Sequence, residues 1–536
     1  MAKPNIPNQK NKYSGLNKRL AGYVALVRQI YDALNLEAAK MAHSVKYNGK
    51  GNEFHFKDYP ELRDRVKKLQ SSFISNLSSV IYSGTSNEWK NSNLVQDLIA
   101  DKVLKAYGAI SKGVEYKQYY QVNSDALRAF QGRKDRGLNL SQKIWNQSEN
   151  YKEELEYAIS TAIQKGTSAV TLSKQISKYL EDFKLLQKDY KAMYGKSVEC
   201  HDCEYRSIRL ARSEINLAYR TAEQKRWEQM DFVVGQEIKI SNNHTCNGVP
   251  FTDICDDLKG KYPKDFKFTG WHPMCRCYVI PILKSEDEFW SDDDVKSKNK
   301  IEDTPYKFKE WVSDNSERIK AGKSKGTLPY FIRENSAYIK SNDLDYAIKD
   351  VINMAEYVKN EVQGLAESIA AKHGAIVTPI NIKSYESIKR KVKGEGSTPY
   401  KLKDIVRTTI IADKEKIKDV LNDLSSSDIF LKLKVQLPED YMGYTGNIVN
   451  IKTVNGLVGE IQVNTASMIY AKEMPDNAKK ILGEKLWAEI ESTYKVEGGL
   501  GHKLYEEIRV LDVLDDYKKY AELVEKSRKY YSVFQY

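Results

Sequence analysis

Residues 447–465, NIVNIKTVNGLVGEIQVNT, carry the clearest sign of a fold in this chain of 536 residues. The Asn455-Gly456 pair at their centre is a strong hairpin signal, because both residues tolerate the positive φ that a two-residue turn requires. In the second predicted strand alternate side chains share a face, so Glu460, Gln462 and Asn464 point the same way. Such polar groups are costly to bury without partners. This face is therefore either exposed to solvent or part of a functional site.

The segments that precede this hairpin alternate between strand and helix. Residues 403–412, KDIVRTTIIA, predict a strand, and residues 414–426 predict an amphipathic helix. Residues 430–438, FLKLKVQLP, alternate apolar and polar side chains with a period of two, as a strand does. This order predicts an α+β domain over residues 344–514, with a mixed sheet flanked by helices. Residues 515–536 are expected to form a C-terminal helical tail.

The composition is typical of a soluble, globular protein of two or three domains, with 41% hydrophobic and 29% charged residues. The net charge of +12 suits a protein that meets nucleotides, DNA or an acidic partner surface, although solubility alone would explain it equally well. No apolar stretch approaches the ~18–20 residues that span a bilayer, and the N-terminus lacks the apolar core of a secretory signal. We therefore expect no membrane insertion. Six cysteines are too few for a disulfide-built fold.

The first part of the chain predicts a mostly helical domain over residues 1–283 that ends in a small β region rich in Cys and His. Its clearest apolar stripe, spaced by three and four residues, consists of Ile208, Ala211, Ile215, Ala218 and Ala222. The charged residues between them, Arg209, Arg212 and Glu214, are expected on solvated or interhelical faces of this helix. The polar residues 284–304 and the short helical piece that follows predict a linker or exposed arm over residues 284–343.

The β region of the first domain concentrates thiols and imidazoles, which are the ligands that zinc prefers. The candidate ligands of a structural Zn²⁺ are Cys246, Cys255, His272, Cys275 and Cys277. Their spacing does not follow the common Cys-x2-Cys pattern, so a reduced and packed cluster or a set of disulfides remain alternatives.

Two short motifs in this first part resemble those of Mu-type phage minor head (head morphogenesis) proteins. The segment His272-Pro-Met-Cys-Arg-Cys277 is similar to the HPxCRC signature of that family, and Arg209-Leu-Ala-Arg-Ser-Glu214 is similar to its upstream helix. Asp257-Leu-Lys-Gly260 lies between them, as a D-L-x-G segment does in the family. The resemblance covers residues 15–285. It implies a virion component at the portal vertex or capsid interior, with portal and capsid proteins as partners and no catalysis of its own.

The last domain contains a spacing that suits a polyphosphate. Lys383, Ser387 and Lys391 are four residues apart and fall on one side of a predicted helix. Two ammonium groups and a hydroxyl are what phosphate oxygens require, although a basic, solvated helix face is the alternative. Asp404 lies at the start of the strand at 403–412, close to Arg407 in sequence. Mg²⁺ prefers carboxylate and phosphate oxygens, so this Asp and a distant Glu are a plausible magnesium pair.

Taken in order, these pieces resemble the RelA/SpoT synthetase family. The resemblance covers about residues 345 to 512 and rests on five elements in the family's sequence order. They are the K-x3-S-I-x2-K run from Lys383 to Lys391, Asp404, Gly443-Tyr444, the E-I-Q-x-x-T run from Glu460 to Thr465, and Gly501-His502-Lys503-x-Tyr505.

The resemblance implies a pyrophosphokinase and a role for each matching residue. Lys383, Ser387, Lys391 and Arg407 would bind ATP, and Asp404 and Glu460 would bind Mg²⁺. Glu460 would also help to deprotonate the acceptor hydroxyl, and Gln462 would support the site. Residues expected at the acceptor are Tyr444, which would stack on its base, Asn464 and His502.

The chain departs from the family pattern at Asn381, where an arginine is usual, and over Gly443–Ile448, which lacks the family's serine and histidine. Guanine nucleotide, adenine nucleotide and the tRNA 3′ end therefore all remain open as acceptors. No hydrolase domain is evident, so such an enzyme would inhibit growth in a host cytoplasm that lacks an antidote or immunity protein. The alternative is a purely structural virion protein whose last domain is an inactive interaction module.

Overall fold

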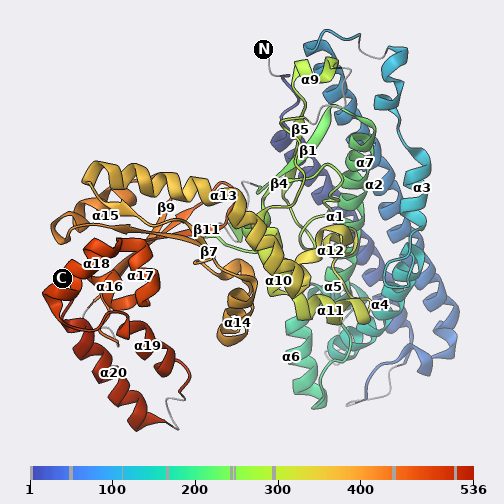
Figure 1. The fold of residues 1–536 in the computed structure, drawn as a ribbon. Coiled ribbons are helices and arrows are strands. Elements are labelled where there is room, and N and C mark those ends of the chain that lie inside the picture. The colour runs from blue at the N-terminus through green and yellow to red at the C-terminus, as the bar shows by residue number, and fades with distance from the viewer. Residues whose placement is uncertain are drawn as a thin grey trace. The chain divides into compact units, whose positions relative to one another are not determined.

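The computed structural model describes residues 4–46, 52–110, 113–163, 168–241, 245–246, 249–291, 297–437, 442–511 and 516–535. It forms two compact units, which are treated separately below. The first unit comprises Met1–Thr304 and Ala321–Ser336, and the second comprises Pro305–Lys320 and Ala337–Tyr536. The chain is mostly helical and also contains a mixed sheet, as expected (Figure 1). No helix in the described ranges is both long and apolar enough to cross a membrane.

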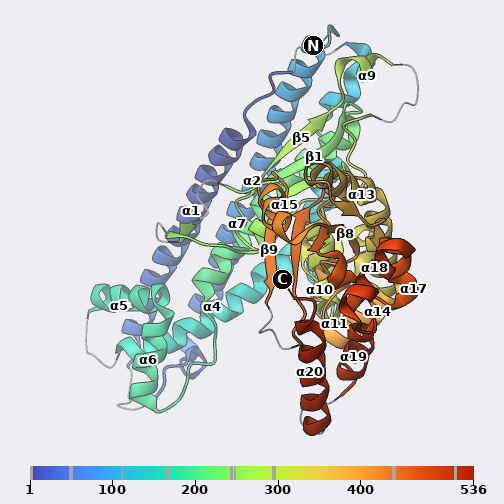
Figure 2. The same cartoon turned by 60° about the vertical axis from the view of Figure 1, so that its left-hand side comes forward.

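The first unit is built around long helices. Its larger helices are α1 (Gln9–Ser44), α2 (Arg63–Ala106), α3 (Ser124–Gly132), α4 (Leu140–Ile163), α5 (Ala169–Glu181), α6 (Phe183–Tyr194) and α7 (Cys203–Gln229). Helices α1 and α2 run side by side, and both pack against α7 (Figure 2). Tyr31 of α1, Phe73 of α2 and Tyr151 of α4 meet edge-on or stacked in the core between these helices.

The apolar stripe that the sequence predicts lies on α7 and is buried. Ile208, Ala211, Ile215, Ala218 and Ala222 are each at most 7% exposed. Of the charged residues between them, Arg212 and Glu214 are buried between helices, whereas Arg209 is exposed to solvent. Glu214 accepts hydrogen bonds from Arg133 at 2.6 Å and from Lys143 at 3.3 Å.

A small sheet follows α7 in the first unit. Its strands β1 (Val233–Lys239), β4 (Gly260–Tyr262) and β5 (Tyr278–Leu283) pair antiparallel in the order β4-β1-β5. The other short elements here are β2 (Thr245–Cys246), β3 (Val249–Pro250), α8 (Ile254–Leu258) and α9 (Glu286–Trp290). The loop before β5 is fixed to α7, since Arg220 donates to the carbonyl of Cys277 at 2.7 Å.

The second unit contains the hairpin that the sequence predicts. Strand β10 (Gly446–Lys452) pairs antiparallel with β11 (Val458–Asn464) across the Asn455-Gly456 turn. The remaining strands are β6 (Ile376–Val377), β7 (Asn381–Ile382), β8 (Val406–Ile411) and β9 (Phe430–Gln436). The order is β6-β8-β11-β10-β9, with β7 also on β8, and the β8–β11 pair is parallel. The sheet is therefore mixed.

Helices cover both faces of this sheet (Figure 1). On one face α13 (Leu344–His373) and α15 (Ile417–Ser425) pack on Val449, Ile461 and Val463. The helices that follow β11 are α16 (Ala466–Lys472), α17 (Pro475–Leu482), α18 (Glu484–Tyr494), α19 (Leu500–Ile508) and α20 (Tyr517–Ser532). Helix α20 lies within the predicted C-terminal tail and belongs to this layer, since Tyr530 and Tyr531 are buried against α16 and α19.

The described parts of residues 284–343 include several helices. Among them are α10 (Tyr306–Asp314), α11 (Ser316–Ser324) and α12 (Tyr330–Arg333). Phe308 and Val312 of α10 are fully buried in the second unit, and Phe331 and Ile332 of α12 are buried in the first. Although the segment is polar in composition, these apolar side chains anchor its helices in the two cores. The domain boundaries at 283, 343 and 514 stay predictions, and 514 lies outside the described residues.

Candidate active site

Asp404 and two lysines form a compact charged group at the start of β8. Lys383 follows β7, and Lys391 lies in α14 (Tyr385–Glu395), which begins at the capping residue Ser384. Both ammonium groups donate to the same carboxylate oxygen, Asp404 Oδ2, from Lys383 Nζ at 2.5 Å and from Lys391 Nζ at 2.9 Å. The two lysines, which are eight residues apart in sequence, thus meet the same side chain, Asp404, at the start of another element.

The two oxygens of Asp404 have different environments. Oδ2 accepts hydrogen bonds from both lysines, whereas Oδ1 is buried and has no hydrogen-bond partner among the described residues. Burial alone would raise the pKa of Asp404, but the hydrogen bonds from Lys383 and Lys391 outweigh it and hold that pKa below its usual range. Asp404 is therefore ionised at neutral pH, with one oxygen left for a further cation.

The polar face of β11 lies beside this group. The parallel register pairs Glu460 of β11 with Arg407 of β8, and Arg407 in turn is opposite Asn381 of β7. Glu460 is only 8% exposed and accepts a hydrogen bond from Gln462 Nε2 at 2.7 Å. The sequence left open whether this polar face is exposed to solvent or part of a functional site. Glu460 is buried and hydrogen-bonded, so solvent exposure is wrong for this residue.

Lys391 connects the two groups electrostatically. Burial opposes the charge of Lys391, but Asp404 and, more weakly, Glu395 and Glu460 raise its pKa above the usual value. The carboxylates of Asp404 and Glu460 therefore act on one ammonium group, although they come from different strands. Lys383, Lys391 and Asp404 are thus in direct contact, and Glu460 is linked to Lys391 through its charge.

Lys472 is a residue of this site that the sequence analysis missed. It ends α16, the helix that follows β11, and its Nζ donates to Gln462 Oε1 at 3.1 Å. Burial opposes its charge, but Tyr444, Glu473 and Glu460 raise the pKa of Lys472 above its usual value. The signal in the sequence was a lysine at the end of the helix that follows the E-I-Q run. No periodicity distinguishes this lysine from other lysines.

Tyr444 and Asn464 lie next to each other at the end of the same face. Asn464 is fully buried and its Nδ2 donates to the Tyr444 hydroxyl at 2.5 Å. The ring of Tyr444 also meets Tyr531 of α20 edge-on, with 5.5 Å between the ring centroids. Tyr444 and Asn464, two of the three residues expected at the acceptor, are thus in contact, and Asn464 lies two residues after Gln462 on β11.

Several buried polar atoms around this face have no hydrogen-bond partner within the described ranges of the chain. They are Asp404 Oδ1, Thr445 Oγ1, Asn450 Nδ2 and Asn464 Oδ1. Asn450 of β10 is directly opposite Glu460 in the register. Buried polar groups in native proteins are nearly always hydrogen-bonded, and these four atoms are therefore available to a ligand at this face.

Two further predicted residues have different outcomes. Ser387 lies in the first turn of α14, where its hydroxyl is 3.0 Å from that of Ser384, the capping residue. His502 is exposed on α19, and within the described residues no hydrogen bond or ion pair joins it to the polar face. The structure therefore does not bring His502 to Tyr444 and Asn464. The assignment of His502 to the acceptor remains a prediction.

The carboxylates fit the Mg²⁺ that the resemblance implies. Mg²⁺ takes one or two carboxylate oxygens together with substrate phosphates and water. Asp404 Oδ1 is a buried, ionised oxygen without a partner, and Glu460 supplies a second carboxylate near the same lysine.

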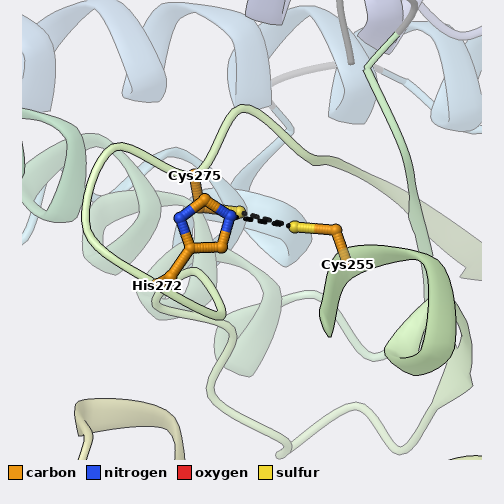
Figure 3. Close-up of side chains that lie close together, drawn as sticks. All are labelled: Cys255, His272 and Cys275. Carbon is orange, nitrogen blue, oxygen red and sulfur yellow. Dashed lines mark hydrogen bonds between the residues drawn. The ribbon is translucent and has the colours of Figure 1, made fainter. Parts of the chain in front are cut away.

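The Cys/His residues of the first unit also come together (Figure 3). Cys255 Sγ lies 3.2 Å from His272 Nε2 and 3.8 Å from Cys275 Sγ. Contacts with the thiols of Cys255 and Cys277 hold the pKa of Cys275 well below its usual value. The cysteines of the described part are free thiols, so disulfides among them are absent. Cys246 has a described backbone in β2, but its side chain lies outside the described residues.

Comparisons with known proteins concern about one third of the chain. No protein-family model matches it. A (p)ppApp synthetase toxin, Tas1 of Pseudomonas aeruginosa strain UCBPP-PA14, is 37% identical over 182 residues, which are 34% of this chain and 41% of that protein. The chain therefore spans less than half the length of this curated relative.

Two solved structures are also similar over part of the chain. The complex between the Type VI effector Tas1 and its immunity protein is 37% identical, with coverage of 35% of this chain and 95% of the other and a TM-score of 0.33. The small alarmone synthetase 1 from Bacillus subtilis is 18% identical, with coverage of 34% and 87% and a TM-score of 0.19. About a third of this chain is homologous to a (p)ppApp synthetase toxin. The sequence identity supports a synthetase-type domain in that third.

Proposed function

We propose that the second unit is an ATP-dependent pyrophosphokinase that modifies an adenine nucleotide and inhibits growth. The observation that carries this proposal is Asp404, whose Oδ2 is held by Lys383 and Lys391 while its buried Oδ1 has no partner. Two ammonium groups and an ionised carboxylate with a free oxygen are suited to a magnesium polyphosphate.

The chemistry is an in-line displacement at phosphorus. The oxygen of an acceptor ribose hydroxyl attacks the β-phosphorus of ATP, the bond from that phosphorus to the α,β-bridging oxygen breaks, and AMP leaves. Lys383 and Lys391 bind phosphate oxygens, and Glu460 accepts the hydroxyl proton. Mg²⁺ held by Asp404 and Glu460 would neutralise phosphate charge. Such a transfer depends on positioning and charge neutralisation more than on covalent participation of the protein.

The comparison with the toxin supports an adenine nucleotide as the acceptor. A relative that is 37% identical over 182 residues is a (p)ppApp synthetase, which favours an adenine nucleotide over a guanine nucleotide or a tRNA end. A solved complex of that effector contains an immunity protein, and this supports an immunity partner for the present chain as well.

A radiolabel assay on the full chain tests the activity. Purified protein is incubated with Mg²⁺, ATP labelled in its γ-phosphate, and either ADP, GDP or deacylated tRNA as acceptor. We expect a labelled, pyrophosphorylated product with ADP, at least ~10-fold faster than with the other two, since a site shaped for one base discriminates against the others. Product only with GDP or tRNA would reassign the acceptor, and no product with any of them would contradict the enzyme.

Matched variants link the activity to this site. Asp404→Asn and Glu460→Gln are expected to lower turnover by at least ~100-fold, since each removes a charge that acts on the phosphates or the attacking hydroxyl. Glu489→Gln, an exposed change on α18, is the control and keeps full turnover. In growth assays the parent chain arrests bacteria and the two site variants do not. Equal growth of all four strains, without product, would favour the inactive interaction module.

For the first unit we propose a minor head protein of the Mu type. The supporting observation is that the helix with the R-L-A-R-S-E motif and the HPxCRC loop contact each other. On α7, Asn216 and Arg220 donate to the carbonyls of Cys275 and Cys277. Recovery of the chain in purified phage heads after induction of a carrier strain, next to portal protein, is the expected result. Its complete absence from particles would contradict this role.

A further inference from the structure

The cluster of thiols and imidazole in the first unit has the dimensions of a metal site. One ligand atom each of Cys255, His272 and Cys275 lies within 4.8 Å of the other two. Cys255 comes from α8, whereas His272 and Cys275 come from the loop before β5 (Figure 3). Residues that are 17 and 20 positions apart in sequence thus converge on one point.

The distances between these atoms match those around tetrahedral zinc. With Zn–S bonds of about 2.3 Å, two thiolates on one ion are about 3.8 Å apart. The observed separation of Cys255 Sγ and Cys275 Sγ is 3.8 Å, and a disulfide would require about 2 Å. Cys255 Sγ and His272 Nε2 are 3.2 Å apart, which is close to the roughly 3.5 Å expected for a sulfur and a nitrogen on one zinc.

The imidazole of His272 has the orientation of a ligand. Its Nδ1 lies 2.8 Å from the carbonyl oxygen of Pro273, so Nδ1 carries the proton and donates it there. Nε2 then carries a lone pair, and it lies 3.2 Å from Cys255 Sγ and 3.3 Å from Asp253 Oδ2. Metal-bound histidines characteristically donate their other ring nitrogen to a carbonyl or carboxylate in this way.

A further thiol for the fourth position is that of Cys277, which lies outside the group of three whose ligand atoms are all within 4.8 Å of one another. Its thiol is buried, 2% exposed, and interacts with the thiols of both Cys255 and Cys275. The carboxylate of Asp253 lies near His272 at 3.3 Å, but it also accepts from the backbone N–H of Cys255 and so caps α8. Three thiolates and one imidazole make a closed, structural set without a position for water or substrate.

A second layer of contacts supports the loop and the charge of such a site. Arg220 donates to the carbonyls of Cys275 at 3.5 Å and Cys277 at 2.7 Å, and Asn216 donates to the carbonyl of Cys275 at 3.4 Å. Three thiolates with one Zn²⁺ carry a net charge of −1, and the buried guanidinium of Arg220 offsets it.

We propose that Cys255, His272, Cys275 and Cys277 bind one structural zinc ion that fastens α8 and the loop before β5 to α7. The side chain of Cys246, a candidate from the sequence, lies outside the described residues. The ion takes no part in pyrophosphoryl transfer. This inference is therefore independent of the function proposed for the second unit.

The first test measures metal in the full chain. Protein purified under reducing conditions without chelators is analysed by inductively coupled plasma mass spectrometry, and we expect about one zinc per chain. Cys255→Ser and Cys275→Ser are expected to lose at least ~90% of it, because each removes a thiolate from a four-ligand set. The control is Cys200→Ser, which changes another buried free thiol of the first unit and keeps the metal.

A second measurement does not depend on the folding of the variants. Wild-type protein is stripped with a chelator under reducing conditions and titrated with Zn²⁺ or Co²⁺. We expect the unfolding temperature of the first unit to fall on stripping and to recover with Zn²⁺, and Co²⁺ to give the visible bands of a tetrahedral thiolate site. A Cys277→Ser protein with an unchanged Co²⁺ spectrum would overturn the fourth ligand. A metal-free wild-type protein that neither Zn²⁺ nor Co²⁺ alters would overturn the site.

Discussion

Among single residues, Lys472 is expected to act as a positioning residue for Glu460. Its Nζ holds Gln462 Oε1, and the other end of that amide donates to Glu460. Without the ammonium group the amide of Gln462 can rotate and Glu460 loses its fixed orientation. Lys472→Met is therefore expected to lower turnover by about 10- to 100-fold with little change in the KM for ATP.

Steady-state kinetics of the purified variant check this expectation. Lys472→Arg should recover part of the turnover, because a guanidinium can still donate to Gln462. Lys479→Met is the control, since Lys479 lies over the ring of Trp487 and away from the polar face. A Lys472→Met protein with a raised KM and unchanged turnover would show that Lys472 binds substrate instead.

Glu223 of the first unit gives a prediction about pH. It is buried, and burial raises its pKa to about 7, although Tyr13 donates to it and Arg220 lowers that pKa. In the unfolded chain glutamate titrates near ~4.3. Between these pH values the folded state binds more protons than the unfolded state. The free energy of unfolding therefore falls as the pH rises from about 4.3 to about 7, by about 4 kcal/mol in total.

Calorimetry of the full chain between about pH 5 and 8, which brackets the upper part of this range, measures the dependence. Glu223→Gln should flatten it and make the first unit more stable than the wild type above about pH 7, because the amide needs no proton. Glu228→Gln, an exposed change on the same helix, should keep the wild-type dependence. Parallel profiles for the wild type and Glu223→Gln would refute the role of this carboxyl.

At the level of elements, the β10–β11 hairpin depends on its turn. Gly456 has a φ of +91°, and a Cβ at this position would lie 2.8 Å from Cβ of Tyr306. Asn455 Nδ2 also donates to the carbonyl of Met354 in α13, which fixes the turn against that helix. Gly456→Ala combines a strained backbone with a clash, and it is expected to destabilise the second unit by about 1–3 kcal/mol.

The control for this turn changes glycine to alanine where space and backbone allow it. Gly364 lies inside α13, is exposed, and has no atom within 4 Å of the position that an added Cβ would take. Gly364→Ala should stabilise the unit by roughly 0.5–1 kcal/mol, because alanine loses less entropy in a helix. Chemical denaturation of both variants tests the pair. Equal stability of Gly456→Ala and the wild type would mean that the turn does not constrain the hairpin.

At the level of the whole molecule, the second unit is discontinuous in sequence. The segment Ala321–Ser336 belongs to the first unit. Helix α10 lies before this segment in sequence, and yet the helix packs in the second unit. Phe308 and Val312 are fully buried there, and Lys309 pairs with Asp350 at 3.0 Å. Removal of α10 should cost about 3–6 kcal/mol, from two large apolar side chains and a broken, partly buried ion pair.

Two fragments test this discontinuity. Residues 305–536, with Phe331→Ser and Ile332→Ser to remove apolar groups that the first unit buries, are expected to fold cooperatively. Residues 344–536, which start at the boundary that the sequence suggests, are expected to be less stable by that amount or insoluble. Equal midpoints of denaturation for the two fragments would show that α10 is dispensable.

The sequence by itself determined the features that depend on local periodicity and on ordered motifs. The hairpin at Asn455-Gly456, the apolar stripe on α7 and the residues Asp404, Glu460 and Gln462 follow from side-chain alternation, helical spacing and motif order. Each of these signals lies within a short stretch, where a strand or helix fixes which side chains share a face.

Only the tertiary structure decided the features that need two distant segments to meet. Asp404 binds both lysines through one oxygen, Lys472 orients Gln462, α10 joins the second unit, and Cys255 meets His272. No spacing in the sequence encodes these contacts, because they are set by sheet order and by how buried apolar side chains pack. Local propensities determined the elements of this protein, and the packing of its two cores decided which of its charged, imidazole and thiol groups became neighbours.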